Sequence, residues 1–134
     1  PERFPEAGEP WTPSKLYYSQ GFSRRRLQAF HDALLERGME SPYTEWLEKW
    51  PTDRPDNADR VTSRILCGEY FPVRDEALRA HATQIDPNSR WFFIPMEIQQ
   101  EIWPYEEYEL ARSLVDTTLP EDDLFAGIRE KVNV

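Results

Sequence analysis

The chain has 134 residues, which is enough for one domain with a hydrophobic core. Its net charge of -9 argues against nucleic acid or an anionic membrane as the main partner, and no apolar run approaches the roughly 18 residues of a membrane-spanning helix. The single cysteine, Cys67, excludes an intrachain disulfide and fits a reducing compartment. Since the chain also lacks a signal-like start, we expect a cytoplasmic protein.

The first residues, PERFPEAGEPWTP, form an irregular, proline-spaced segment that does not begin with methionine. A domain that is processed after synthesis and a fragment of a longer protein can both begin in this way. The start of the chain leaves both interpretations open.

The N-terminal third predicts one strand and two helices. A short apolar and aromatic run predicts a strand near 15–19 that ends before Gly21. A helix over about 24–37 follows, with Ser23 as its N-cap, Gly38 as its stop and apolar residues at helical spacing: Leu27, Phe30, Leu34 and Leu35. After Ser41-Pro42, a two-turn helix that ends at Pro51 has one apolar face, formed by Tyr43, Trp46, Leu47 and Trp50.

The rest of the chain predicts two more strands and two more helices. A polar loop over 51–60 precedes a strand over 61–67, which is rich in β-branched residues. A helix runs from Pro72 to about Ile85 and ends at Asp86, because a residue before proline avoids the helical region. Residues 90–95 form a buried connector, a short helix runs from Pro95 to about Trp103, and alternation over 107–114 favours a strand. We expect the tail to dock on the body through its apolar residues, Leu124, Phe125 and Ile128.

Three strands interleaved with helices indicate the α/β class. Three strands are few for an independent sheet, so we expect partner strands outside this chain. Residues 1–134 are treated as a single unit.

The residues that could ligate a metal or act as a nucleophile form no recognisable motif. A catalytic zinc usually needs three protein ligands, whereas His31, His81 and Cys67 lie far apart with no H-x-x-x-H, H-x-x-H or C-x-x-C spacing. We therefore expect no metal site and no catalytic residue within this chain. Cys67 lies in an apolar strand, where a cysteine is usually inert.

Two other groups of residues each admit two interpretations. The arginines Arg24, Arg25 and Arg26 crowd the first turn of a helix, where they either help to hold an anion or pair with the many carboxylates at the surface. The aromatic rows Tyr43/Trp46/Trp50 and Trp91/Phe92/Phe93 either line a sugar-binding platform or belong to the core.

The stretch ALRAHATQID (77–86) places His81 and Gln84 one turn apart on the predicted helix, beside the apolar stripe of Leu78 and Ile85. A buried imidazole and a buried carboxamide both need hydrogen-bond partners. Those partners are either backbone groups or the hydroxyl groups of a substrate at the rim of a pocket.

Four segments carry a resemblance to a known family: FPEAGEPWTPSKLYY (4–18), CGEYFPVRDEALRAHATQIDPN (67–88), WPYEEYELARS (103–113) and DLFAGI (123–128). Together they resemble the C-terminal part of the LmbE/PIG-L family of zinc-dependent N-deacetylases, within its branch of mycothiol S-conjugate amidases. The resemblance implies a Rossmann-like fold, of which this chain supplies about three strands. It also implies hydrolysis of a thiol-sugar conjugate to an N-acetylcysteine S-conjugate, a mercapturic acid, and glucosaminyl-inositol.

The zinc motifs of that family, H-P-D-D and H-P-D-H, do not occur in this sequence. The resemblance therefore implies that zinc is bound by an N-terminal half absent from this chain, and that the chain alone is inactive. By the same resemblance, His81 and Gln84 are substrate-binding residues near the pocket, and the N-terminal half of the same fold is the expected partner. The alternatives are the acetylglucosaminyl-inositol deacetylase of mycothiol biosynthesis and a non-catalytic sugar-binding module.

Overall fold

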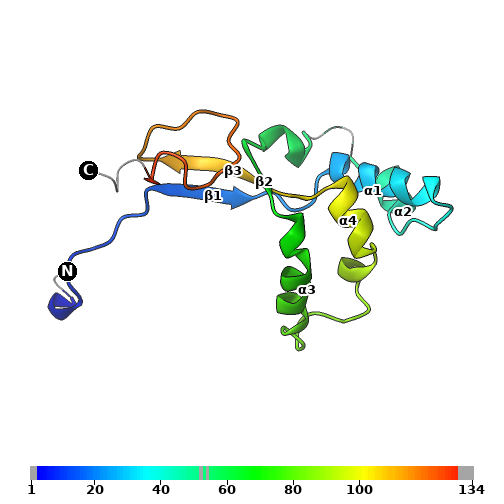
Figure 1. Cartoon of the computed structure of the whole chain (residues 1–134), viewed down its shortest axis with the longest axis horizontal. Helices are drawn as coiled ribbons and strands as arrows, with labels where there is room; N and C mark the ends of the chain where they lie inside the picture. The colour runs from blue at the N-terminus through cyan, green and yellow to red at the C-terminus, as the bar shows by residue number, and fades with distance from the viewer. Residues whose placement is uncertain (1–2, 52, 54, 130–134) are drawn as a thin grey trace.

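The computed structural model describes residues 3–51, 53 and 55–129. Three strands, β1 (Lys15–Ser19), β2 (Ser63–Leu66) and β3 (Tyr105–Ser113), form one sheet in the order β1-β3-β2. The described α-helices are α1 (Arg24–Glu36), α2 (Thr44–Glu48), α3 (Phe71–Arg79) and α4 (Met96–Ile102). Figure 1 shows α1, α2 and α4 gathered beyond one end of the sheet, whereas α3 projects from it and the N-terminal segment extends away from the body.

The strand β3 is the centre of the sheet. It pairs antiparallel with β1 from Lys15↔Ser113 to Ser19↔Tyr108, and antiparallel with β2 from Ser63↔Tyr108 to Leu66↔Tyr105. The expected mixed α/β class is thus confirmed. The three strands make no parallel ladder with one another, so these described residues do not by themselves form a Rossmann-like sheet.

The predicted strand over 15–19 and the predicted helix over 24–37 are both confirmed to within a residue. The Ser23 hydroxyl caps α1 by accepting a hydrogen bond from the Arg26 backbone N–H at 3.1 Å. The second predicted helix is present as the short α2, and the fourth predicted helix is present as α4. The strand predicted over 61–67 is shorter, and the strand predicted over 107–114 begins two residues earlier, at Tyr105.

The helix predicted from Pro72 to about Ile85 is wrong at its C-terminal end, because α3 stops at Arg79 and turns follow. Most of a helix's stability in a protein comes from packing an apolar face. After Leu78, which is only partly buried, every residue up to Gln84 is exposed. The residues from Arg79 to Gln84 therefore bury no apolar face that would extend the helix.

Two predictions of burial are also wrong in part. In the connector over 90–95, Ile94 is buried, but Trp91 and Phe93 are exposed. In the tail, Leu124 and Ile128 are partly buried as expected, but Phe125 is exposed.

The buried core lies between α1 and α4 rather than on the sheet. It is formed by one face of α1 and residues that follow along the chain: Leu27, Phe30, Ala33, Leu34, Tyr43, Ile94, Ile98 and Trp103. Leu34 is completely buried, whereas its neighbour Leu35 is 53% exposed. This contrast is the expected result of the helical period that the sequence displays.

The C-terminal tail is held to the sheet by the buried carboxylate of Glu121. Lys15 Nζ donates to its Oε2 at 2.7 Å, Ser63 Oγ donates to its Oε1 at 3.1 Å, and the Tyr17 hydroxyl donates to Oε1 as well. Lys15 Nζ also donates to the Ala126 carbonyl at 3.1 Å. Burial by itself would raise the pKa of Glu121, but these hydrogen bonds outweigh burial and lower the pKa below its ordinary value of 4.5.

We predict that Leu34→Ala lowers the free energy of unfolding by about 2–5 kcal/mol, because it removes a fully buried side chain and leaves a cavity. The matched variant Leu35→Ala, on the exposed face of the same helix, should change stability by less than about 1 kcal/mol. Urea unfolding followed by circular dichroism checks both. Equal losses from the two variants would contradict the placement of the core.

We predict that Glu121→Gln lowers the free energy of unfolding at neutral pH by about 3 kcal/mol, because it leaves the buried Lys15 ammonium without its counter-charge. Since folding lowers the pKa of Glu121, its contribution is complete above about pH 4.5 and is lost as the pH falls through the folded-state value. The stability difference between wild type and variant, measured by urea unfolding from pH 7 to pH 3, should therefore shrink on acidification. The exposed Glu69→Gln is the control, and a difference that does not depend on pH would contradict this account.

Candidate functional site

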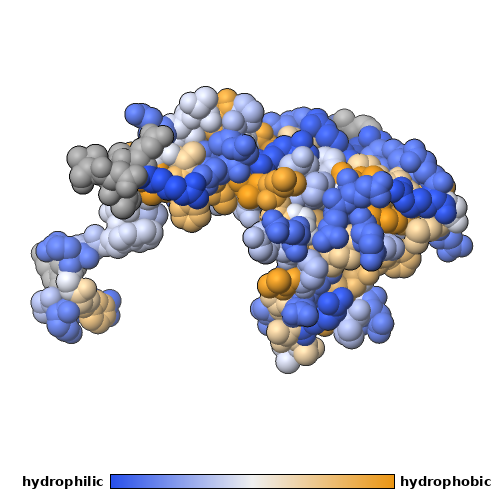
Figure 2. Space-filling model, viewed as in Figure 1, coloured by the Kyte–Doolittle hydropathy of each residue, from blue (hydrophilic) through white to orange (hydrophobic). Residues whose placement is uncertain are grey.

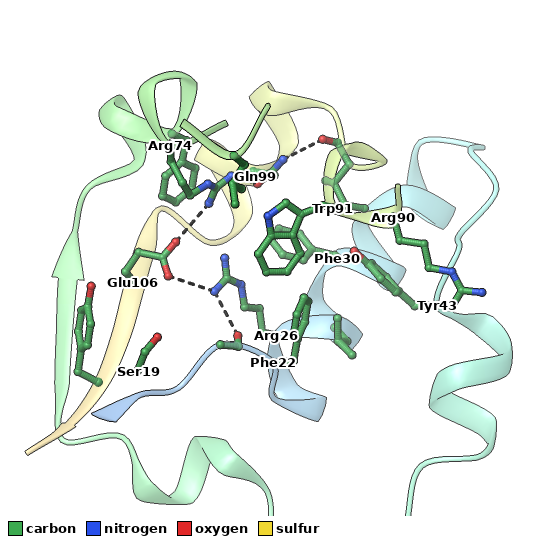
Figure 3. A pocket seen from close by; sticks show the side chains of 16 residues that line it. Ser19, Phe22, Arg26, Phe30, Tyr43, Arg74, Arg90, Trp91, Gln99 and Glu106 are labelled. Atoms are coloured by element: carbon green, nitrogen blue, oxygen red, sulfur yellow. Dashed lines mark hydrogen bonds and ion pairs between the residues drawn. The ribbon is translucent and has the colours of Figure 1, made fainter. Parts of the chain in front are cut away.

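A pocket of about 400 Å³ opens where the helices meet the end of the sheet. Figure 3 shows side chains from β1, α1, α3, α4, β3 and the connector before α4 converging on it. Its wall is mainly aromatic and aliphatic, with a few charged groups among these side chains. The lining residues are Ser19, Gly21, Phe22, Arg26, Leu27, Phe30, Tyr43, Phe71, Arg74, Leu78, Arg90, Trp91, Ile94, Gln99, Glu106 and Tyr108.

Arg74 is the most strongly fixed polar group of the pocket. Its Nη2 donates to Gln99 Oε1 at 2.7 Å, and its Nη1 donates to Glu106 Oε1 at 3.2 Å. Its Nε and Nη2 also donate to Asp75 Oδ1, and the guanidinium lies 4.1 Å from the centre of the Phe71 ring. Gln99 in turn donates from Nε2 to the Ile94 carbonyl at 2.9 Å. This network ties α3, α4 and β3 together.

Arg26 faces the same carboxylate from the opposite side. Its Nη1 lies 3.6 Å from Glu106 Oε2 and 3.4 Å from the Gly21 carbonyl oxygen. Glu106 therefore lies between two guanidinium groups, one tightly and one loosely paired (Figure 3).

The aromatic side of the pocket contains residues of both aromatic rows, Tyr43/Trp46/Trp50 and Trp91/Phe92/Phe93. Phe22 contacts both, with ring centres 6.3 Å from Trp46 and 5.0 Å from Trp91. Tyr43 lines the pocket from within the core, and burial raises the pKa of its hydroxyl above 10.0 against the opposing effect of Arg26 and Arg90. The two rows therefore belong partly to the core and partly to a pocket wall.

His81 and Gln84 do not line this pocket. Both side chains are exposed and lie in the turn that follows α3, where the Gln84 N–H donates to the His81 carbonyl at 2.8 Å. The His81 Nδ1 lies 2.8 Å from the Ala77 carbonyl oxygen, which can only accept, so Nδ1 carries the proton. In the neutral imidazole, Nε2 is then a hydrogen-bond acceptor at the protein surface. The prediction that both residues lie on a buried helical stripe is wrong.

At the start of α1, the backbone N–H groups of Arg24 and Arg25 are not free to hold an external anion. The backbone N–H groups of Arg24 and Arg25 donate to the two carboxylate oxygens of Asp56, at 2.9 and 3.1 Å. The Arg25 side chain faces Asp59 at 3.7 Å and is exposed. The pairing interpretation is thus confirmed for the Arg25 side chain, whereas Arg24 meets a carboxylate through its backbone N–H.

The remaining candidates have structural partners. His31 Nδ1 lies 2.8 Å from Ser41 Oγ, and burial raises the pKa of the Cys67 thiol, which disfavours the reactive thiolate. Within residues 3–51, 53 and 55–129, no group of three or more His, Cys, Asp or Glu side chains could hold a metal ion. The described residues thus do not fit a zinc site of their own.

Several pocket residues carried no functional signal in the sequence. The sequence pattern around Glu106 predicts only a strand, and the pattern around Gln99 predicts only a helix. Arg90 belongs to the connector before α4. Only the arrangement of β3 against α1 and α3 brings the Glu106 carboxylate to Arg26 and Arg74.

None of the helices in the part of the chain that the structure describes is long and apolar enough to cross a membrane.

Comparison with characterised proteins gives several relatives. The chain is 56% identical over 132 residues to the mycothiol S-conjugate amidase of Streptomyces coelicolor, an alignment that covers 96% of this chain and 44% of that protein. It is 35% identical to 1D-myo-inositol 2-acetamido-2-deoxy-alpha-D-glucopyranoside deacetylase 1 of Frankia alni, over 96% of this chain and 45% of that protein. The corresponding deacetylase of Streptomyces avermitilis is 30% identical, over 92% of this chain and 42% of that protein.

No family model and no solved structure matches the chain. The chain spans less than half the length of the three relatives named. Over that part, the identity of 56% shows common descent. The chain is therefore a partial homologue of the mycothiol S-conjugate amidases and of the related inositol-sugar deacetylases.

Proposed function

We propose that the chain is the C-terminal portion of a zinc-dependent amide hydrolase that acts on mycothiol S-conjugates in detoxification. The reaction would release an N-acetylcysteine S-conjugate and glucosaminyl-inositol. The observation that carries this proposal is the identity of 56% with the Streptomyces coelicolor amidase across nearly the whole chain, against 35% with the Frankia deacetylase.

In this proposal the metal comes from the other portion of the enzyme. The described residues contain no suitable ligand group, and the amidase relative is more than twice as long as the matched region. The absent portion would supply the zinc ligands and the remaining strands of a Rossmann-like sheet. This chain would supply part of the pocket wall and no catalytic residue.

The exposed apolar side chains support a docking surface for that portion. Leu16 and Tyr18 of β1 are 49% and 52% exposed, Leu66 of β2 is 67% exposed, and Val73 of α3 is 63% exposed. Figure 2 shows apolar surface over the sheet region and on α3 among hydrophilic surroundings. Exposed apolar residues in such number are typical of a surface that is covered in a larger assembly.

We assign substrate binding to His81 and Gln84, which share one exposed turn. The Nε2 of His81 would accept a hydrogen bond from a hydroxyl group, because Nδ1 already donates to the Ala77 carbonyl. The Gln84 carboxamide both donates and accepts, which suits a polyol.

The test uses a chimera that joins the N-terminal portion of the Streptomyces coelicolor amidase to this chain. We predict that the chimera hydrolyses the bimane S-conjugate of mycothiol, and that His81→Ala and Gln84→Ala each raise KM about 3- to 10-fold with a smaller effect on kcat. This range corresponds to the loss of one hydrogen bond made in ground and transition states alike. Steady-state kinetics with each variant checks the prediction.

Glu76→Ala, which removes an exposed side chain from α3, the helix that precedes this turn, is the control and should leave KM unchanged. Unchanged kinetics for His81→Ala and Gln84→Ala would contradict their assignment. A chimera that prefers acetylglucosaminyl-inositol over the thiol conjugate would favour the deacetylase alternative, which the Frankia relative supports. An inactive chimera, with glucosaminyl-inositol binding by the chain alone, would favour the sugar-binding module.

A further inference from the structure

The pocket differs in charge from the rest of the chain. The whole chain has a net charge of -9, yet the charged residues lining the pocket are Arg26, Arg74 and Arg90 against the single carboxylate of Glu106. The buried Asp75 carboxylate, which pairs with Arg74 behind this lining, offsets one of these charges, so a preference for an anionic ligand has to come from Arg26.

The three arginines are not equivalent. Arg74 is held by Asp75, Gln99 and Glu106 and stacks on Phe71, so it is a fixed part of the wall. The Arg90 guanidinium lies 5.6 Å from the centre of the Trp46 ring, and the residue is exposed. Within the described part of the chain, the Arg90 side chain forms no ion pair with a carboxylate.

Arg26 has unused capacity in the centre of the pocket. Its side chain is only 11% exposed, and its contacts with Gly21 and Glu106, at 3.4 and 3.6 Å, are both long and both made through Nη1. A guanidinium has five N–H donors and binds a carboxylate best through two parallel hydrogen bonds. A nearly buried cation with such weak pairing would gain from a closer carboxylate.

The walls around Arg26 suit an apolar body of moderate size. Phe22, Phe30 and Trp91 lie on the side of Arg26 away from Glu106 in Figure 3, and Trp91 is 42% exposed. The volume of about 400 Å³ lies within the range for small-molecule sites. Tyr43 also lines the pocket, so its hydroxyl adds a neutral hydrogen-bonding group to the same wall.

We propose that this pocket binds a small organic acid with an aromatic or alkyl body. Its carboxylate pairs with Arg26, and its body packs against Trp91 and Phe22. The proposal depends on the geometry of the pocket and holds whether or not the chain is part of an amidase.

The experiment is isothermal titration of the 134-residue chain with N-acetylphenylalanine and with its neutral isostere, N-acetylphenylalaninamide. We expect the acid to bind at least about tenfold more tightly, which is the discrimination that one charge-assisted hydrogen bond supports. Arg26→Gln should abolish this preference, and Trp91→Ala should weaken the acid and the amide alike.

Arg25→Gln is the matched control, since Arg25 is the neighbouring arginine but its side chain is 65% exposed and faces Asp59. It should bind as the wild type does, and circular dichroism verifies that each variant is folded. Equal affinity for acid and amide, an unchanged preference in Arg26→Gln, or no heat of binding at millimolar acid would each overturn the proposal. Because the assay measures binding without turnover, its failure is distinct from failure of the amidase proposal.

Discussion

The pairing of β3 with two neighbouring strands is the interaction on which the rest of the structure depends. β1 and β2 do not pair with each other, so both owe their position to β3. The same strand carries Glu106 and Tyr108 into the pocket. Its partners β1 and β2 provide Lys15, Tyr17 and Ser63, which hold the carboxylate of Glu121 and with it the C-terminal tail.

The pocket shows how one carboxylate can join elements that are distant in the sequence. Glu106 on β3 meets Arg74 on α3 and Arg26 on α1, and Arg74 continues the network to Gln99 on α4. The first turn of α1 is itself fixed by Ser23 and by the Asp56 carboxylate, so Arg26 starts from a well-defined backbone position. The pocket thus combines a rigid charged wall at Arg74 with a loosely paired cation at Arg26. That combination is the basis of the proposed acid-binding site.

Local signals in the sequence were enough to predict most elements. The spacing of Leu27, Phe30 and Leu34 together with the Ser23 cap predicted α1 and its buried face, and β-propensity and alternation located all three strands. The end of α3 could not be predicted, because the last turn depends on tertiary packing that the exposed residues Arg79 to Gln84 do not receive. The same error placed His81 and Gln84 on a buried stripe, whereas they lie exposed in a turn. Glu106 was not predicted as a pocket residue, because its position depends on strand pairing, which no local sequence pattern indicates.

The central claim is that this chain belongs to an amide hydrolase whose metal is bound by the other portion of the enzyme. The most direct test is the zinc content per polypeptide of the purified 134-residue chain and of the chimera, after dialysis against metal-free buffer. The account predicts well under one zinc per molecule of the chain alone and close to one per molecule of the chimera. One tightly held zinc in the chain alone would contradict it, since the ligands would then have to come from His31, His81, Cys67 or nearby carboxylates.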